Sequence, residues 1–178
     1  MFDPCLTTFR MMWHLLFRLP LYMILLLFAY PGVFGFCVVG YYGRIKTTDL
    51  LLKRNIHVAS IYLLCYSENE SIKHMFLECN FSFSIILSII SEACTLLLRP
   101  GILQLLYWIN ECSSFSLVVK KFYYLATCCS VYFIWRERNE RRFGSNGNCP
   151  TSMAIKIKKA IFAKVIKWKN YECLLDRF

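Results

Sequence analysis

The sequence predicts a mainly α-helical protein with one small irregular segment that contains cysteine and histidine. Residues 117–143 have the pattern of one long helix, and a further helix begins at Pro150. Turn and linker signals, Arg99-Pro100-Gly101 and Gly144–Asn148, separate the apolar segments. We therefore expect apolar helices to flank a short segment that lacks regular structure.

The composition indicates a surplus of core-forming side chains. Hydrophobic residues make up 57% of the 178 residues and charged residues 18%, against roughly 45–50% and 25% in average globular proteins. This composition excludes a disordered polyelectrolyte, a collagen-like repeat and a coiled coil. It fits a membrane protein, a fragment cut from a larger assembly, or a decayed reading frame.

The N-terminal part carries the strongest membrane signal. Leu19–Tyr42 is a run of 24 uncharged residues, and about 20 suffice to cross a bilayer. A predicted turn at Pro31-Gly32 interrupts this run and leaves 12 residues, Leu19–Tyr30, before it. A run of that length is more typical of a buried helix. Anchoring in a membrane through residues 19–42 therefore stays as an alternative to a packed segment.

Short elements are expected between residues 47 and 71. Thr47 or Thr48 is a suitable N-cap for a short helix that should end near Asn55. Residues 56–64 are expected to be extended, and Ser67–Ser71 is polar and typical of a turn.

Helices are expected in the second half of the chain. Residues 81–98 are apolar up to the stop at Arg99-Pro100-Gly101, and Ile102–Asn110 is a second apolar segment. The helix over residues 117–143 should carry two i,i+4 ion pairs near its end, Arg136–Glu140 and Glu137–Arg141.

The last helix combines an apolar stripe with positive charge. The stripe is expected to pack on the preceding domain and consists of Ile157, Ile161, Val165 and Trp168. Of the net charge of +10, +7 lies in residues 136–178, which hold 11 Lys or Arg against 4 Asp or Glu. Such a basic end favours an anionic partner, nucleic acid or an anionic lipid surface, and is equally compatible with a solvated helix face.

The segment from residue 62 to residue 79 has the spacing of a metal site. His74 and Cys79 show the H-x4-C spacing of a zinc knuckle, and Cys65 lies nine residues before His74. Structural zinc takes four sulfur or nitrogen ligands in a tetrahedron, but the C-x2-C partner position of Cys65 holds Tyr62. A phenol with a pKa near 10 is a poor ligand at neutral pH. Spacing alone therefore predicts a zinc-knuckle-like segment with three ligands of four, and His57 or Cys94 is a further source of a fourth.

The ten cysteines indicate mostly free thiols. A secreted disulfide framework normally belongs to a shorter, loop-rich chain. Cys37, Cys128 and Cys129 lie inside apolar runs, where cysteine acts as a small hydrophobic residue. We expect a reducing compartment, nuclear or cytoplasmic, with a membrane location as the alternative. A chance grouping of two buried thiols beside an exposed histidine is the alternative to a metal site.

Three motifs in order carry a family resemblance. Gly43–Leu51 reads G-R-I-K-T-T-D-L-L, Glu70–Cys79 reads E-S-x2-H-M-F-x2-C, and Ile134–Asn139 reads I-W-R-E-R-N. In this order, residues 28–145 resemble the zinc-binding domain that follows the polymerase in plant non-LTR (LINE-type) retrotransposon reverse transcriptases. That family's pattern runs G-R-L-x-T-x-D-x-L, C-x2-C, E-(S/T)-x2-H-L-F-x2-C and I-W-x-E-R-N.

The resemblance implies a zinc-binding domain at residues 28–145, between an apolar segment (residues 1–27) and a basic amphipathic helix (residues 146–178). Cys65, His74 and Cys79 carry over as zinc ligands. Tyr62 stands where the family has its first cysteine, which implies weak or lost zinc binding.

The resemblance also implies sequence-independent contact with RNA or DNA, beside a reverse transcriptase domain. The candidate residues for phosphate contact are Arg136, Arg138, Arg141, Arg142, Lys156, Lys159 and Lys167, together with Lys158, Lys164 and Lys169. Such contact is sensitive to salt. The alternative is that the arginines mostly pair with Glu137 and Glu140 on their own helix.

The sequence shows no catalytic constellation. Its three aspartates, Asp3, Asp49 and Asp176, form no paired motif that could hold two metal ions. It contains neither G-x-x-x-x-G-K nor G-x-S-x-G. We therefore interpret the chain as a non-catalytic zinc-binding module derived from a reverse transcriptase. A small membrane-associated protein anchored by residues 19–42 is the alternative.

Overall fold

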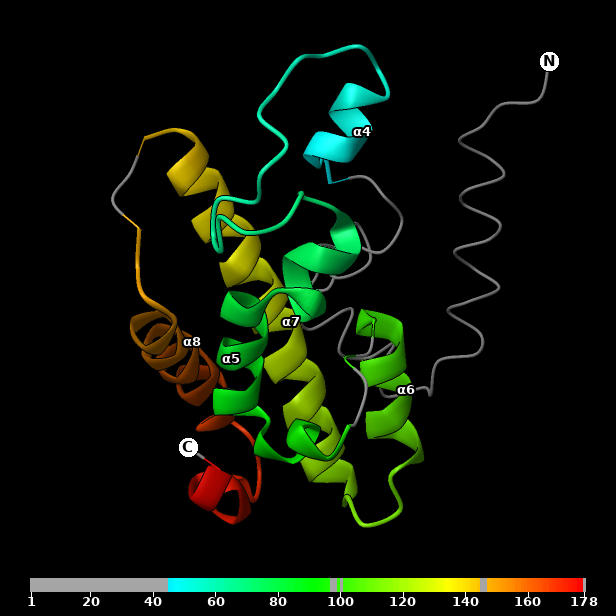
Figure 1. Cartoon of the computed structure of the whole chain (residues 1–178). Coiled ribbons are helices and arrows are strands. Elements are labelled where there is room, and N and C mark those ends of the chain that lie inside the picture. Colours follow the sequence, from blue (N-terminus) through cyan, green and yellow to red (C-terminus); the bar gives the residue numbers. More distant parts are fainter. Residues whose placement is uncertain (1–44, 97–98, 100, 145–146, 178) are drawn as a thin grey trace, which may run out of the picture.

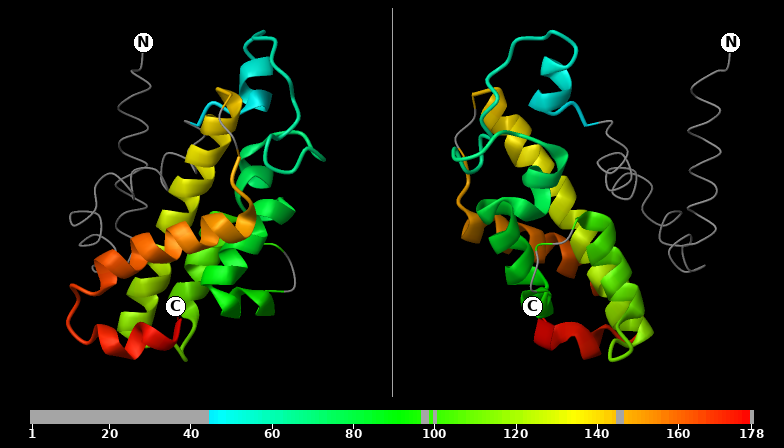
Figure 2. Two further views of the ribbon diagram at one scale, coloured as in Figure 1. Left: turned by 90° about the vertical axis from the view of Figure 1, so that its left-hand side faces the viewer. Right: turned by 45° about the vertical axis from the view of Figure 1, so that its right-hand side comes forward.

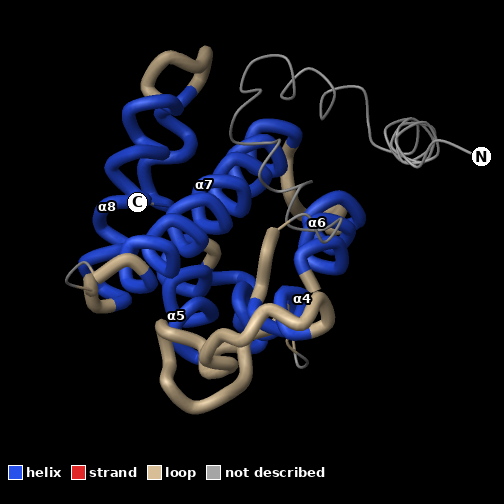
Figure 3. The backbone as a smooth tube through the Cα atoms, turned by 90° about the horizontal axis from the view of Figure 1, so that it is seen from above, coloured by secondary structure: helices blue, strands red, loops and turns tan. Residues whose placement is uncertain are grey.

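The computed structural model describes residues 45–96, 99, 101–144 and 147–177, which form a protein of helices and loops. Within these ranges there is no strand (Figure 3). One isolated β-bridge joins Ile61 to Asn69. The elements are α4 (Thr48–Leu52), η1 (His74–Glu78), α5 (Asn80–Ile89), η2 (Ser91–Thr95), α6 (Ile102–Glu111), α7 (Leu117–Arg142), α8 (Pro150–Val165) and η3 (Tyr171–Arg177). The mainly α-helical fold class is thus confirmed.

Helix α7 runs through the middle of the fold, with α5 on one side and α6 on the other (Figure 1). It begins where the Ser116 hydroxyl accepts a hydrogen bond from the Val119 amide, at 3.4 Å. Residues 122–131 are all buried, among them Cys128 and Cys129, which pack as free thiols. The predicted long helix is therefore the core helix of the molecule.

Helix α7 is also the one described helix that is long and apolar enough to cross a membrane. Of its most apolar window, 67% is buried inside the fold, which is typical of a central core helix. The run at residues 19–42, on which the membrane alternative depends, lies outside the described residues.

Helix α8 crosses α7 on the outside of the fold and packs against both α5 and α7 (Figure 2). Pro150 is its first residue, a position where the missing N–H costs nothing. The predicted stripe faces inward: Ile157, Ile161 and Val165 are fully buried, and Trp168 packs against the core from the following turn. The packing of this helix on the rest of the chain is therefore confirmed.

The shorter elements follow the sequence signals closely. Thr47 is the N-cap residue of α4, and Asn55 closes the following turn with a left-handed φ of 59°. The apolar run at residues 81–98 does not form one helix. Helix α5 ends at Ile89, and Ile90 leaves helical geometry before the short η2 turn begins.

Candidate metal centre

The loop that carries Cys65 is a tight, hydrogen-bonded turn. The Tyr62 amide donates to the Glu68 carbonyl at 2.8 Å, and the Tyr66 amide donates back to the Tyr62 carbonyl at 2.9 Å. Tyr66 takes a left-handed φ of 57°, which lets the chain reverse direction. The β-bridge between Ile61 and Asn69 closes the base of the loop. Cys65 is thus held at the tip of a fixed turn.

His74 and Cys79 are brought together by one turn of π-helix. In η1 the Cys79 amide donates to the His74 carbonyl at 2.9 Å, a bond between residues five apart. The Ser71 hydroxyl accepts from the His74 amide at 3.1 Å and so caps the start of this turn. Cys79 is also the N-cap residue of α5. The π-helical turn therefore places the side chains of His74 and Cys79, which are five residues apart, on the side that faces the Cys65 loop.

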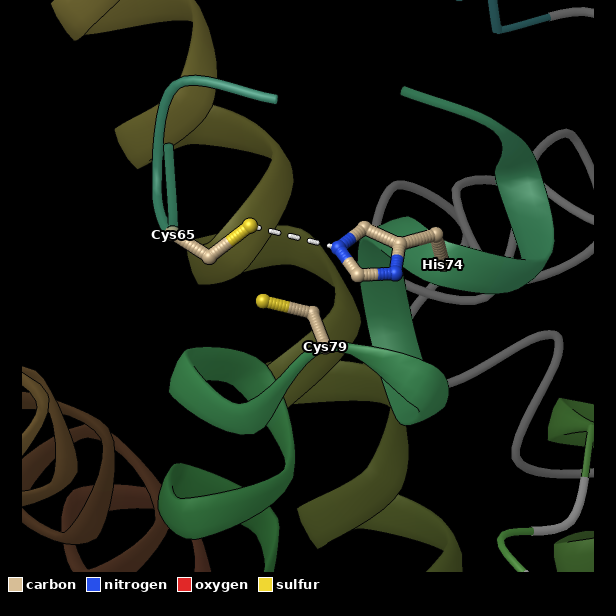
Figure 4. Close-up of side chains that lie close together, drawn as sticks. All are labelled: Cys65, His74 and Cys79. Carbon is tan, nitrogen blue, oxygen red and sulfur yellow. Dashed lines mark hydrogen bonds between the residues drawn. The ribbon is translucent and has the colours of Figure 1, made fainter. Parts of the chain in front are cut away.

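The three side chains predicted as ligands lie together in the structure (Figure 4). Their ligand atoms are all within 4.8 Å of one another, and the Cys65 Sγ lies 3.3 Å from the His74 Nε2. Cys79 is buried, whereas Cys65 and His74 are half-buried. The cluster is therefore a preformed group of two sulfur atoms and one imidazole at the edge of the core.

Tyr62 occupies the fourth position of the motif as a core residue. Its side chain is fully buried, and its hydroxyl donates to the Met75 carbonyl at 3.0 Å. The Ser82 hydroxyl donates to the same carbonyl at 2.6 Å. The Tyr62 ring meets the His74 ring edge to face, with 5.5 Å between the centroids. Burial raises the pKa of Tyr62 well above its usual value, so the phenol stays neutral.

The two thiols differ in acidity. Partial burial raises the pKa of Cys65, but hydrogen bonds from Ser67 and from His74 outweigh it and lower the pKa to about 6. Burial is the main cause that raises the pKa of Cys79 above its ordinary value. Since metals bind the thiolate form, Cys65 is available as a ligand at neutral pH, while Cys79 releases its proton on binding.

The chemistry of these donors fits zinc. Two thiolates and an imidazole are common zinc ligands, and ligands of a tetrahedral zinc ion lie roughly 3.3–3.8 Å apart. The observed donor separations need to contract by no more than about an ångström to reach this geometry. In the described part of the chain, no fourth His, Cys, Asp or Glu joins the cluster. His57 and Cys94 are both exposed elsewhere.

A buried carboxylate beside the cluster joins the three sequence motifs. Glu70 is fully buried and accepts hydrogen bonds from the Thr48 amide at 3.0 Å and the Arg138 Nε at 2.9 Å. Arg138 Nη2 and Arg142 complete its ion pairs. Sequence reasoning missed this role, although Thr48, Glu70 and Arg138 each belong to a different one of the three sequence motifs, Gly43–Leu51, Glu70–Cys79 and Ile134–Asn139. All three are motif residues that are not candidate zinc ligands, and this was the signal from which a structural role could have been inferred.

A second buried carboxylate fixes the linker before α8. Glu137 accepts from the Asn148 amide at 2.6 Å, from the Asn148 side chain at 2.7 Å and from Arg141 at 3.1 Å. Arg141 also donates to the Leu63 carbonyl at 3.1 Å. The end of α7 thereby supports the Cys65 loop directly, because Leu63 lies in that loop.

The four candidate arginines for phosphate contact are not equally placed. Arg138 and Arg141 point inward, and Arg138 is only 5% exposed. Arg142 is half-buried and pairs with Glu70. Arg136 is exposed and forms the predicted i,i+4 pair with Glu140, at 2.7 Å. All four arginines thus form ion pairs with acidic residues. Arg138, Arg141 and Arg142 are buried or half-buried, and of the four only Arg136 is exposed.

The candidate lysines lie on α8 and the turn that follows it, and all but the half-buried Lys158 are exposed. Lys156, Lys159 and Lys167 are exposed, and the Lys156 ammonium donates to the Asn148 side chain at 2.5 Å. The structure therefore separates the basic candidates into three inward-facing or half-buried arginines, Arg138, Arg141 and Arg142, and a surface group of Arg136 and the lysines.

Comparison with known proteins agrees with the geometry. A family model described as zinc-binding in reverse transcriptase matches residues 31–85, the segment that contains the whole Cys65, His74 and Cys79 cluster. No curated protein and no solved structure matches the chain. The resemblance to the zinc-binding domain of reverse transcriptases is thereby confirmed for this segment.

Proposed function

We propose that this chain, whose residues 31–85 match the zinc-binding family of reverse transcriptases, is a non-catalytic zinc-binding module of retrotransposon origin. The observation that carries the proposal is the convergence of Cys65, His74 and Cys79 within 4.8 Å inside the matched segment. The motif order shared with plant LINE-type elements supports the retrotransposon source. A polymerase domain of that kind is the expected neighbour.

Zinc would have a structural role at this site. When bound, it would tie the Cys65 loop to η1 and to the start of α5. Cys65 would bind as the thiolate, His74 through Nε2, and Cys79 after loss of its proton. Because Tyr62 holds the fourth position with its hydroxyl turned to a backbone carbonyl, the fourth ligand would come from solvent. We infer a reduced form of the family's four-ligand site.

The surface lysines support a role in nucleic-acid binding. Residues 150–171 contain six lysines and no acidic residue, and Arg136 lies at the surface of α7, where it pairs with Glu140. Contact through these groups would be independent of sequence and would weaken as salt rises. Arg138, Arg141 and Arg142 would act indirectly, by holding the fold.

Zinc titration tests the proposal on the full chain. With a chromogenic chelator as competitor, the wild type should bind one equivalent of zinc, and Cys65→Ser, His74→Ala and Cys79→Ser should each abolish that equivalent. Cys94→Ser is the matched control, because Cys94 is exposed and lies outside the cluster. Zinc binding that survives all three cluster substitutions would overturn the assignment.

A further inference from the structure

The outer face of α8 carries large apolar side chains that are partly exposed to solvent. The inner face of this helix buries Ile157, Ile161 and Val165 completely. On the opposite side, Ile155 is 50% exposed, Phe162 38% and Ile166 45%. These exposures are high for large apolar residues, and they are unexpected on a helix whose packing is already satisfied.

The exposed apolar residues lie in one row with a lysine between them. At 3.6 residues per turn, positions 155, 159, 162 and 166 fall within about 60° of one another around the helix axis. We call Ile155, Lys159, Phe162 and Ile166 the outer stripe. Lys156 and Lys158 lie on its two sides, and residues 150–171 contain no acidic residue. The face therefore alternates apolar contact area with positive charge.

We propose that the outer stripe binds single-stranded nucleic acid. This inference rests on the proposed function for the choice of nucleic acid, and it adds the state of the strand. A single strand exposes both its phosphates and the apolar faces of its bases, so it can meet lysines and apolar side chains on one surface. A duplex stacks its bases inside and presents phosphates to a face of this kind. The apolar side chains of the outer stripe therefore favour single-stranded over double-stranded nucleic acid.

The arrangement within the stripe favours this ligand over a lipid surface. A helix that lies in a bilayer interface presents a continuous apolar face with its lysines at the border. Here Lys159 lies in the middle of the apolar row, between Ile155 and Phe162, and each apolar side chain is no more than half exposed. Alternation of charge with apolar area matches a polymer that alternates phosphate and base.

Fluorescence anisotropy on the full chain tests the proposal. The probes are an oligothymidylate of about 16 nucleotides, the upper end of usual single-strand site sizes, and a DNA hairpin of the same total length. The combined variant Ile155→Ser, Phe162→Ser, Ile166→Ser should lose at least about tenfold in affinity for the single strand, with little change for the hairpin. Leu117→Ser is the matched control, because Leu117 is 53% exposed on α7.

The lysines give the second arm of the experiment. Lys156→Gln combined with Lys159→Gln should weaken both ligands and reduce the dependence of affinity on salt. If the lysine variant binds both probes as the wild type does, the proposed role in nucleic-acid binding fails. The lysine variant can weaken binding while the apolar variant leaves the affinity for the single strand unchanged, or lowers the affinity for both probes equally. In either case the single-strand inference fails and the proposed function stands.

Vesicles give the third arm. Vesicles of phosphatidylcholine with and without phosphatidylserine are the lipid probe. The inference would be overturned if the wild type binds the anionic vesicles, the apolar variant does not, and both bind the oligonucleotide equally well. The outer stripe would then be a lipid-binding surface.

Discussion

Neutralising Glu70 should remove the link between the start of α4, the loop before η1 and the C-terminal end of α7. Its buried carboxylate contacts the Thr48 amide, the Arg138 guanidinium and Arg142 at once. Glu70→Gln keeps the size of the side chain but removes its charge. The guanidinium of Arg138, whose side chain is 6% exposed, would then lack its counter-charge in the core.

The expected loss follows from the burial of both partners. Removing one member of a buried ion pair costs about 3–5 kcal/mol, because the remaining charge stays desolvated. Glutamine keeps one carbonyl oxygen for the Thr48 amide, so we expect the lower end, about 3 kcal/mol. With a urea slope of about 2 kcal/mol per molar, the unfolding midpoint should fall by about 1.5 M.

Urea unfolding followed by circular dichroism measures this loss. Glu140→Gln is the matched control, because Glu140 pairs with Arg136 at the surface, where the side chains are 38% and 52% exposed. That control should cost no more than about 0.5 kcal/mol. The double variant Glu70→Gln, Arg138→Gln should lose about 1–3 kcal/mol less unfolding free energy than the sum of the losses of the two single variants. Equal losses for Glu70→Gln and Glu140→Gln would refute the reasoning.

Four further substitutions test neighbouring parts of the structure. Tyr62→Phe should lower the unfolding free energy by about 1 kcal/mol, because one hydrogen bond is lost. Tyr62→Cys should lower it by about 3 kcal/mol without metal, as measured by unfolding in chelator. Tyr62→Cys should also tighten zinc binding, as measured by zinc titration. Burial raises the pKa of Glu137, but hydrogen bonds from Asn148 and Arg141 outweigh it and hold the pKa below its ordinary value. Glu137 therefore contributes stability that is present above the unfolded pKa and is lost as pH falls through the folded pKa, and Glu137→Gln should flatten the fall of the urea midpoint below about pH 4.5. Gly144 has a φ of +90° with open space around it, so Gly144→Ala should cost about 1 kcal/mol in the same assay.

Local signals predicted the helices well because their boundaries depend on neighbouring residues. Ser116 and Pro150 mark the starts of α7 and α8 through capping and a fixed φ. The break at Ile90 escaped prediction, because the apolar run continues through it and only packing against the rest of the core decides where α5 ends.

The candidate site was predictable to the extent that its ligands are close in sequence. Cys65, His74 and Cys79 meet through one turn and one π-helical turn, both local structures. The ion pair between Glu70 and Arg138 joins residues 68 positions apart. An arginine in a charged helix segment such as residues 136–142 has the same sequence signature whether it faces solvent or a buried carboxylate, so the sequence could not separate these cases.

The central claim is that one zinc ion is held by two sulfur atoms and one imidazole, with a light atom as the fourth ligand. Extended X-ray absorption at the zinc edge, on the zinc-loaded full chain, counts these ligands directly. We expect two sulfur atoms at about 2.3 Å and two nitrogen or oxygen atoms at about 2.0–2.1 Å, with a third sulfur atom in the Tyr62→Cys variant. Three or four sulfur atoms in the wild type, or no retained zinc, would contradict it.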